Sequence, residues 1–349
     1  MNKESKIIVG VSTGDLNGIG LEVIIKTFSD KRIFDFCTPV IFGSTKVFSY
    51  HKKTLHSEVQ VHGIKSLDGL VHGKLNLINT WKEEVPVDLG NPTTESGSYA
   101  LKSLEAATNA LKLKRVDILL TAPISKENIQ SSTFQFAGHT EYLESALEGE
   151  SLMILMTDGL RLGLVTGHVP ISRVSEIIDR GLVLNKVEIM HRTLVQDFGI
   201  SKPKIAVLGL NPHCGDHGVI GNEDEEIIRP VISEIQKRGQ LVYGPYAADG
   251  FFGSNNYLQF DGVLAMYHDQ GLVAFKTIAF GNGVNFTSGL NEIRVSPDHG
   301  TAFEIAGKNK ADASSFSEAL HKGLEIFKRR KNHQLLIKNP LKVKKHKKV

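Results

Sequence analysis

Three short apolar segments of this chain each end at a histidine. They read LGLVTGH at 162–168, IAVLGLNPH at 205–213 and VLAMYH at 263–268, and each histidine has a glycine within three residues. Segments of this length and composition are typical of strands buried in an α/β sheet, and open α/β sheets carry their chemistry where such strands end. We therefore expect a doubly wound α/β fold in which strands alternate with helices, with the three histidines at one edge of the sheet.

If the three strands share one sheet edge, the imidazoles of His168, His213 and His268 can converge on one point. Three neutral imidazoles with an open position form the ligand set of a catalytic divalent metal site. Three nitrogen ligands favour zinc or cobalt, and the sequence does not exclude magnesium or manganese. Cys214 and His217 are alternative ligands, although Cys214 directly follows His213 and is expected to point elsewhere.

The bulk composition limits the class of protein. The chain has 349 residues, of which 41% are hydrophobic and 23% are charged, which suits a sizeable core and a length of two domains. No apolar run approaches the roughly 20 residues of a membrane span. Only two cysteines occur, Cys37 and Cys214, so we expect a reducing cytoplasm and no disulfide framework.

Charge is distributed unevenly along the chain. Residues 328–349 carry ten Lys or Arg and no Asp or Glu, which leaves 31 basic and 38 acidic residues in 1–327. The net charge of +3 therefore combines a mildly acidic body with a basic tail. A nucleic acid or an anionic surface could bind such a tail. A solvated and mobile terminus is the simpler expectation, and we do not expect nucleic acid as a partner.

The first predicted strand, 6–11, leads into a glycine-rich turn, STGDLNGIG at 12–20, before a predicted helix at 21–28. A strand-to-helix turn of this kind can present backbone N–H groups to an anion. The glycines at 14, 18 and 20 do not follow the G-x-G-x-x-G spacing of dinucleotide-binding turns. A tight turn without a ligand is therefore an equal alternative.

Two further segments place polar groups at the ends of predicted elements. Lys126 follows a predicted strand, where a lysine could contact a substrate, and His139 and Thr140 precede a predicted helix. Free N–H groups at a helix N-terminus favour phosphate or carboxylate, and the alternative is that Thr140 only caps the helix. Asp249 and Asp269 could accept a hydrogen bond from a metal-bound imidazole.

Eight motifs distributed over residues 6–328 resemble those of one enzyme family and occur in the family's order. They read TGDLNGIG, TAPISKE, GHTEYL, TGHVP, LGLNPHCG, MYHDQGL, FGNGVNFT and SPDHGTAFEIAGKNKAD. The family is that of the 4-hydroxythreonine-4-phosphate dehydrogenases, which act in pyridoxal phosphate biosynthesis. The chain departs from it at Leu16 and Leu21, where the family usually has proline, and in its basic tail.

The resemblance implies a two-domain αβα architecture like that of the isocitrate and isopropylmalate dehydrogenases, with the active site in the cleft between the domains. The expected parts are a nucleotide-binding domain at 1–135 plus 288–328, a metal, substrate and dimerisation domain at 136–287, and the basic tail at 329–349. The resemblance also implies a homodimer whose active sites take residues from both subunits. We expect His168 and His213 from one chain and His268 from the other.

The resemblance further implies roles for individual residues. The metal ligands are the three histidines named above, and NAD or NADP accepts the hydride. The expected substrate-binding residues are His139, Thr140, Lys276, Asn285 and Arg294. The expected cofactor-binding residues are Gly14, Asp15, Gly18, Gly20, Asp298, His299 and Gly300. The base that removes the hydroxyl proton is left open between Lys276, Asp249 and a relayed water.

The implied reaction is oxidation of 4-phosphohydroxy-L-threonine, a phosphorylated amino acid, at C3. The resulting β-keto acid loses carbon dioxide to give 3-amino-2-oxopropyl phosphate, on the route to pyridoxine 5'-phosphate. One alternative is a paralogous dehydrogenase that oxidises another phosphorylated hydroxy acid, such as a four-carbon sugar acid phosphate, or a dihydrodiol. An alternative of another class is a non-enzymatic protein that binds nucleic acid through its tail.

Overall fold

The computed structural model describes residues 6–131, 134–279 and 281–338. One twelve-stranded sheet runs through the molecule in the order β3-β4-β2-β1-β5-β12-β11-β6-β7-β10-β8-β9. The strands are β1 Ile7–Ser12, β2 Cys37–Gly43, β3 Val61–Ile64, β4 Leu75–Asn79, β5 Ile118–Thr121, β6 Gly149–Thr157, β7 Leu160–Leu164, β8 Lys204–Leu208, β9 Leu241–Tyr246, β10 Gly262–Ala265, β11 Val284–Leu290 and β12 Arg294–Pro297.

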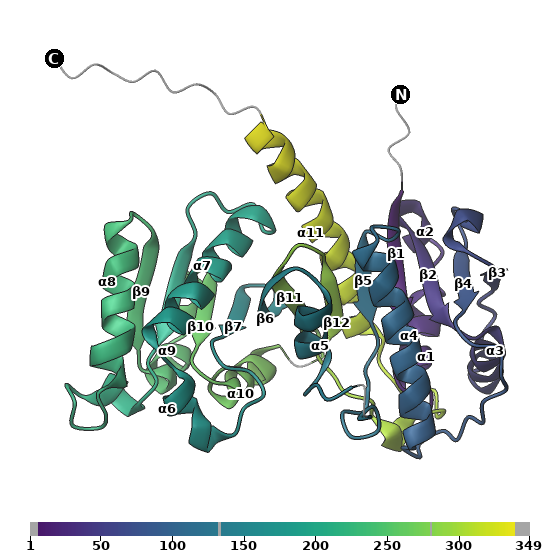
Figure 1. Ribbon diagram of the computed structural model, residues 1–349, viewed down its shortest axis with the longest axis horizontal. Helices are drawn as coiled ribbons and strands as arrows, with labels where there is room; N and C mark the ends of the chain where they lie inside the picture. The colour runs from purple at the N-terminus through teal and green to yellow at the C-terminus, as the bar shows by residue number, and fades with distance from the viewer. Residues whose placement is uncertain (1–5, 132–133, 280, 339–349) are drawn as a thin grey trace.

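The sheet consists of two parallel blocks joined by an antiparallel seam. β3, β4, β2, β1, β5 and β12 are parallel to one another, as are β7, β10, β8 and β9. Between the blocks, β12 pairs antiparallel with β11, β11 with β6, and β6 with β7. Figure 1 shows the two blocks as two lobes, with β12, β11 and β6 between them.

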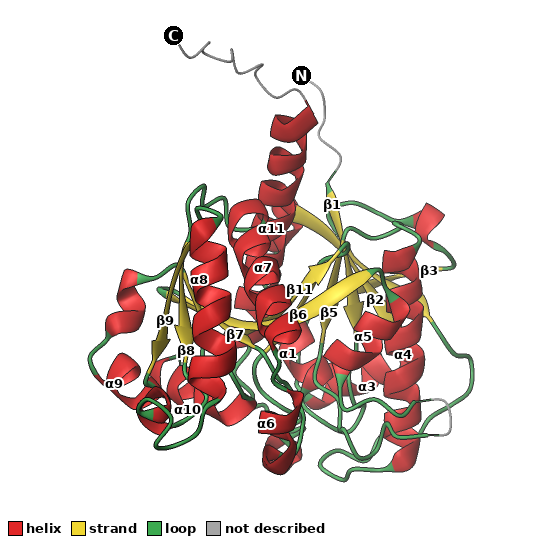
Figure 2. Ribbon diagram, turned by 60° about the vertical axis from the view of Figure 1, so that its left-hand side comes forward, coloured by secondary structure: helices red, strands yellow, loops and turns green. Residues whose placement is uncertain are grey.

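Helices cover the sheet, so that most strands are buried along nearly their whole length (Figure 2). Thr93 and Asp179 cap two of them by accepting hydrogen bonds from the N–H groups of Ser96 and Leu182. None of the described helices is long and apolar enough to cross a membrane. The helices are α1 Gly20–Thr27, α2 Ile33–Phe36, α3 Thr45–Thr54, α4 Thr94–Lys112, α5 His139–Ala146, α6 Val174–Ile177, α7 Arg180–Gln196, α8 Arg229–Lys237, α9 Ala248–Gly253, α10 His268–Ile278 and α11 Ser314–Lys338.

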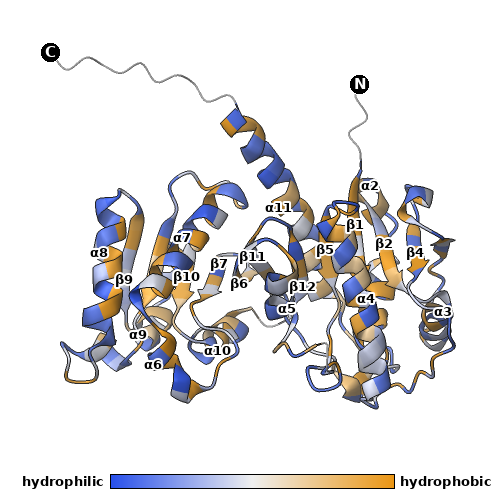
Figure 3. Cartoon of the chain, in the orientation of Figure 1, coloured by the Kyte–Doolittle hydropathy of each residue, from blue (hydrophilic) through white to orange (hydrophobic). Residues whose placement is uncertain are grey.

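One apolar core extends through both lobes. The same cluster of contacting buried side chains includes Val9 and Ile41 in one lobe and Ile205 and Val242 in the other. Figure 3 shows apolar residues concentrated on the strands and polar residues on the helices around them. Because burial of this apolar surface stabilises both lobes together, the strand ends of the two lobes hold fixed positions around the space where the lobes meet.

The expected α/β class is confirmed, but two expected boundaries fall inside regular elements. The boundary between 287 and 288 lies within β11, which pairs with β12 on one side and with β6 on the other. The boundary at 329 lies within α11, so the expected mobile tail is helical as far as Lys338. The reason is Arg330, which is 6% exposed and forms an ion pair with Asp197 just after α7. Residues 339–349 of the expected tail lie outside the described residues.

Candidate active site

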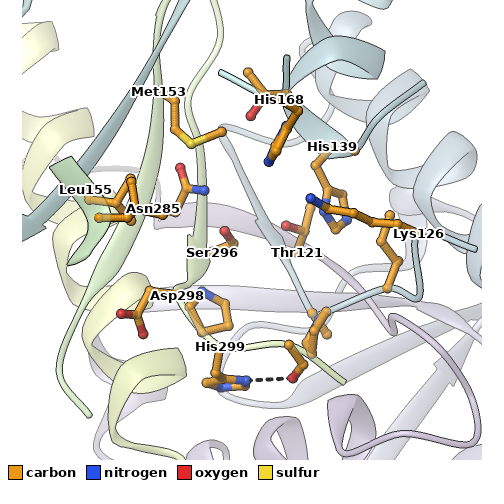
Figure 4. A pocket seen from close by; sticks show the side chains of 18 of the residues that line it. Thr121, Lys126, His139, Met153, Leu155, His168, Asn285, Ser296, Asp298 and His299 are labelled. Carbon is orange, nitrogen blue, oxygen red and sulfur yellow. Dashed lines mark hydrogen bonds between the residues drawn. The ribbon is translucent and has the colours of Figure 1, made fainter. Parts of the chain in front are cut away.

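The candidate site is a cavity of about 290 Å³ where the two lobes meet. It is lined by the ends of β5 and β12, the first turn of α5, one side of α10 and residues of β6 and β11. Figure 4 shows polar side chains from several of these elements around a common space. Open α/β sheets bind ligands where the strand order changes direction, and the seam between the two parallel blocks is such a place.

Arg294, at the start of β12, is a buried cation in this cavity, only 2% exposed. Its guanidinium donates from Nε and Nη2 to Thr121 Oγ1, at 3.1 and 2.7 Å, and from Nη1 to Thr287 Oγ1 at 3.1 Å. Burial lowers the pKa of Arg294 to about 9, and the Glu141 carboxylate opposes that shift. Among the described residues its partners are hydroxyls and not carboxylates. A buried cation held in this way leaves positive charge that an anionic ligand would neutralise.

His139 and Asn285 offer unpaired polar atoms in the same cavity. His139 Nε2 and Asn285 Oδ1 are buried and have no hydrogen-bond partner in the described part of the chain. Burial, together with the positive charges of Arg294 and Lys126, lowers the pKa of His139 well below its usual value, so its imidazole is neutral. Because buried polar atoms are nearly always hydrogen-bonded, these two atoms are candidates for ligand contact.

The structure brings all five expected substrate-binding residues to this cavity: His139, Thr140, Lys276, Asn285 and Arg294. Lys126, which the sequence supported only weakly, lines it too. Lys276 lies on α10 two turns after His268, with Nζ 3.4 Å from the carbonyl oxygen of Asp298. Three cationic side chains around one small space suit phosphate and carboxylate groups.

The three expected metal ligands follow neighbouring strands. β10 pairs in parallel with β7 on one side and with β8 on the other, so His168, His268 and His213 lie at one edge of the sheet, as predicted. His168 and His268 line the cavity, and their ring centroids are 5.4 Å apart. His213 is exposed and does not line it. Within residues 6–131, 134–279 and 281–338, no group of three or more His, Cys, Asp or Glu is placed to hold a metal.

The expected division of these ligands placed His168 and His213 in one chain and His268 in the other. His268 lies beside His168 in the same chain, because their strands are adjacent. His213 and Cys214 sit in a turn with left-handed backbone conformations, φ 52° and 53°, which leaves His213 exposed and Cys214 buried. Burial and the neighbouring His168 lower the pKa of His268, which favours the neutral form that binds metals.

Glu141, the third residue of α5, was missed in the sequence. Its Oε1 lies 2.8 Å from His168 Nδ1. The sequence-based expectation gave this contact to Asp249 and Asp269. Asp269 Oδ2 is 3.5 Å from His268 Nδ1, on a side chain that is 79% exposed. Asp249 is exposed on α9 and does not line the cavity, so its expected catalytic position is not formed within this chain. The available signal was the position of Glu141 directly after the two substrate residues of the GHTEYL motif.

The glycine-rich turn at 12–20 is buried against the loop that follows β5. Its four expected cofactor-binding residues are all buried: Gly14, Asp15, Gly18 and Gly20. The Asp15 N–H donates to the carbonyl oxygen of Pro123 at 3.0 Å. Gly14 has φ +68°, and a Cβ there would lie 2.3 Å from the same oxygen, so the position requires glycine. The turn therefore packs against the loop after β5.

The other three expected cofactor-binding residues do line the cavity: Asp298, His299 and Gly300. His299 Nδ1 is 3.0 Å from the carbonyl oxygen of Gly300 (Figure 4). Its Nε2 is buried and without a hydrogen-bond partner among the described residues. The segment after β12 therefore forms a polar wall that has an atom free for a second ligand.

Comparison with known proteins identifies the family. The family model described as Pyridoxal phosphate biosynthetic protein PdxA matches residues 35–322. This chain belongs to the PdxA family. A 4-hydroxythreonine-4-phosphate dehydrogenase from Bacteroides thetaiotaomicron is 46% identical over 341 residues, which cover 97% of this chain and 94% of that protein. A D-threonate 4-phosphate dehydrogenase from Cupriavidus necator is 36% identical over 328 residues, which cover 93% of this chain and 98% of that protein.

Solved structures of PdxA-like enzymes share the fold. The 4-hydroxythreonine-4-phosphate dehydrogenase of Klebsiella pneumoniae matches with a TM-score of 0.79 at 28% identity, covering 94% of this chain and 99% of that one. The enzyme of the same name from Burkholderia phymatum matches with a TM-score of 0.75 at 34% identity, covering 93% and 99%. These matches confirm the resemblance predicted from the motifs, the α/β fold and membership of an oxidoreductase family.

Proposed function

We propose that this PdxA-family chain oxidises 4-phosphohydroxy-L-threonine at C3, with NAD or NADP as hydride acceptor and a divalent metal, in pyridoxine 5'-phosphate biosynthesis. The observation that carries the proposal is the cavity itself. In it, the buried Arg294, whose hydrogen bonds to Thr121 and Thr287 go to hydroxyls, lies in the same space as the neutral His139 and the pair His168 and His268. A buried cation that is hydrogen-bonded to hydroxyls, together with two converging imidazoles, fits a phosphorylated substrate held beside a metal.

The cationic side chains would bind the two anionic groups of the substrate. Arg294 presents a planar fork of N–H donors, which suits a phosphate or a carboxylate, while Lys126 adds a point charge. The unpaired atoms of His139 and Asn285 can then contact the polar groups between the two anions. Holding both ends of a short substrate fixes the position of its C3 hydroxyl in the cavity.

Two features of the chain fit a divalent metal. His168 and His268 converge on the cavity, and the contact of Glu141 with His168 Nδ1 leaves Nε2 available as a ligand. We assign the third position to His213 of the partner subunit, and three nitrogen ligands favour zinc or cobalt over magnesium or manganese. When bound, the metal supplies a Lewis acid for the C3 oxygen.

The oxidation needs a hydride acceptor and a base. The C3–H bond breaks with its electron pair passing to NAD or NADP, for which the wall at 298–300 is the candidate contact surface. The O–H bond breaks with its proton passing to the base. Lys276 is the candidate base, because it lines the cavity and Asp249 does not. The product is a β-keto acid, which loses carbon dioxide to give 3-amino-2-oxopropyl phosphate.

A homodimer with shared sites is part of the proposal. The loop that carries His213 also carries Val219 and Ile220, whose side chains are 80% and 41% exposed. Val273, on α10 near His268, is 64% exposed. Apolar side chains exposed beside two metal-ligand candidates are expected where a second subunit covers them. A two-fold dimer formed there would bring the partner's His213 toward the pair in this chain.

The test measures the reduction of NAD or NADP by purified metal-loaded protein, using the absorbance of the reduced nicotinamide as the readout. 4-Phosphohydroxy-L-threonine should be oxidised, with one carbon dioxide released for each reduced cofactor. D-Threonate 4-phosphate is the comparison substrate, because the relative of that name covers nearly the same length of chain. A higher kcat/KM for D-threonate 4-phosphate would reassign the substrate, and no reduction with either compound would refute the proposal.

A further inference from the structure

Three consecutive residues at the start of α5 serve two parts of the cavity. His139 and Thr140 line the space assigned above to the substrate. Glu141 comes next and contacts the imidazole of His168, which follows β7 in the other lobe. One turn of one helix therefore touches both the substrate region and a candidate metal ligand.

The contact of Glu141 with His168 determines which ring nitrogen is free. An ionised carboxylate only accepts hydrogen bonds, so the hydrogen between Glu141 Oε1 and His168 Nδ1, 2.8 Å apart, belongs to Nδ1. The lone pair of a neutral His168 must then be on Nε2. Figure 4 shows the ring of His168 projecting into the space between His139 and Asn285.

The equivalent contact at His268 is weaker. Asp269 Oδ2 is 3.5 Å from His268 Nδ1, and the Asp269 side chain is 79% exposed, against 32% for Glu141. The carboxylate of Glu141 has a second oxygen that is buried and has no hydrogen-bond partner among the described residues. Of the two converging imidazoles, the one at 168 is therefore held in a fixed orientation.

We propose that Glu141 is a positioning residue that fixes the tautomer and orientation of His168, so that Nε2 faces the metal, and that it couples the metal site to the substrate turn of α5. The inference rests on the proposed function, because it concerns the metal assigned there. Partners of metal-bound histidines raise the basicity of the ligand nitrogen and fix the ring, and their loss typically lowers metal affinity about 10- to 100-fold.

The charge of Glu141 should affect cation binding at His168 and anion binding at Arg294 in different ways. The Glu141 carboxylate is close enough to Arg294 to act on it electrostatically. Loss of its negative charge should weaken the binding of a cation at His168 and should not weaken the binding of an anion at Arg294. Disruption of the first turn of α5 would instead weaken both, because His139 and Thr140 belong to that turn.

The experiment compares Glu141→Gln with Glu144→Gln, a change of the same kind one turn later on α5. Glu144 is exposed and its Oε1 accepts a hydrogen bond from the Ser151 N–H, which a glutamine can also accept. Cobalt affinity of the metal-free full-length protein is measured by competition with a chelator, and inorganic phosphate affinity by calorimetry. We expect Glu141→Gln to lower cobalt affinity about 10- to 100-fold with phosphate affinity undiminished, and Glu144→Gln to change neither.

A second measurement does not depend on metal. Long-range proton–nitrogen NMR of the histidine-labelled, metal-free protein should show His168 with hydrogen on Nδ1, and Glu141→Gln should mix the two tautomers. Three results for Glu141→Gln would each overturn the inference. They are a cobalt affinity equal to that of the wild type, a parallel fall in cobalt and phosphate affinity, and an unchanged tautomer of His168. Absence of cobalt binding in the wild type would instead count against the metal in the proposed function, and the tautomer would still decide the role of Glu141.

Discussion

Arg294 donates two hydrogen bonds to the single hydroxyl oxygen of Thr121, from Nε at 3.1 Å and from Nη2 at 2.7 Å. The two residues belong to the adjacent parallel strands β12 and β5, so the sheet itself sets their contact. A hydroxyl oxygen can accept these bonds but cannot neutralise the guanidinium. The cavity therefore contains a buried positive charge whose partner is expected to be a ligand.

Arg294→Met should abolish most anion binding at this cavity. We expect kcat/KM to fall by an amount equivalent to about 2 to 5 kcal/mol, the range for a buried charge partner. Inorganic phosphate at roughly 100 times its Kd should stabilise the wild type by about 2.7 kcal/mol in thermal unfolding and the variant by much less. Arg115→Met removes a half-exposed arginine that pairs with Asp68 and is the control. Equal stabilisation of Arg294→Met by phosphate would place the anion site elsewhere.

The sequence left the base open between Lys276, Asp249 and a relayed water, and the two side chains differ in their position in the structure. Only Lys276 lines the cavity. Lys276→Ala should lower kcat by about 10²-fold or more, the contribution of a positioned acid or base. Asp249→Ala should leave kcat near that of the wild type, as measured in the same steady-state assay. A larger loss of kcat in Asp249→Ala than in Lys276→Ala would mean that α9 reaches a site of the partner subunit.

Hybrid dimers test how the histidines are divided between subunits. Because His168 and His268 converge within one chain, a His168→Ala chain paired with a His213→Ala chain should contain one complete site. Random pairing should then recover about a quarter of wild-type activity from two inactive parents. Pairing His168→Ala with His268→Ala should recover none, because each chain then carries a damaged His168–His268 pair and both sites are incomplete. Recovery in the second mixture and not in the first would support the division that the family resemblance implied.

The buried His51 should make stability depend on pH. Its Nε2 lies 2.9 Å from the carbonyl oxygen of Leu16, and burial lowers its pKa from 6.5 to about 4. Between these values the unfolded chain binds a proton that the folded chain does not, so stability is lost as pH falls from 6.5 toward 4. The loss amounts to roughly 3 kcal/mol. His51→Gln keeps a donor for Leu16 and should show a flatter profile in urea unfolding across that range, whereas an identical slope would contradict the assignment.

The buried strands that precede the three histidines could be predicted from the apolar runs in the sequence. Apolar runs ending at His168, His213 and His268 identified neighbouring parallel strands, because a buried strand has a characteristic composition and length. The five expected substrate residues also line one cavity.

What the sequence could not show depends on contacts between distant segments. The basic composition around Arg330 resembled a mobile tail, yet Asp197, 133 residues earlier, pairs with it. The glycines at 14–20 resembled an anion-binding turn, yet the Asp15 N–H in this turn donates to the carbonyl oxygen of Pro123, and the same oxygen fills the space beside Gly14. The contact of Glu141 with His168 depends on the packing of α5 beside the segment after β7, which the sequence does not reveal.

The most direct test of the central claim follows the hydrogen at C3. 4-Phosphohydroxy-L-threonine carrying deuterium at C3 is supplied to the metal-loaded protein with NAD or NADP, and the reduced cofactor is analysed by mass spectrometry. The account predicts one deuterium in the reduced nicotinamide for each carbon dioxide released, and loss of both in Arg294→Met. No transfer of deuterium from this substrate, with active transfer from C3-labelled D-threonate 4-phosphate, would contradict it.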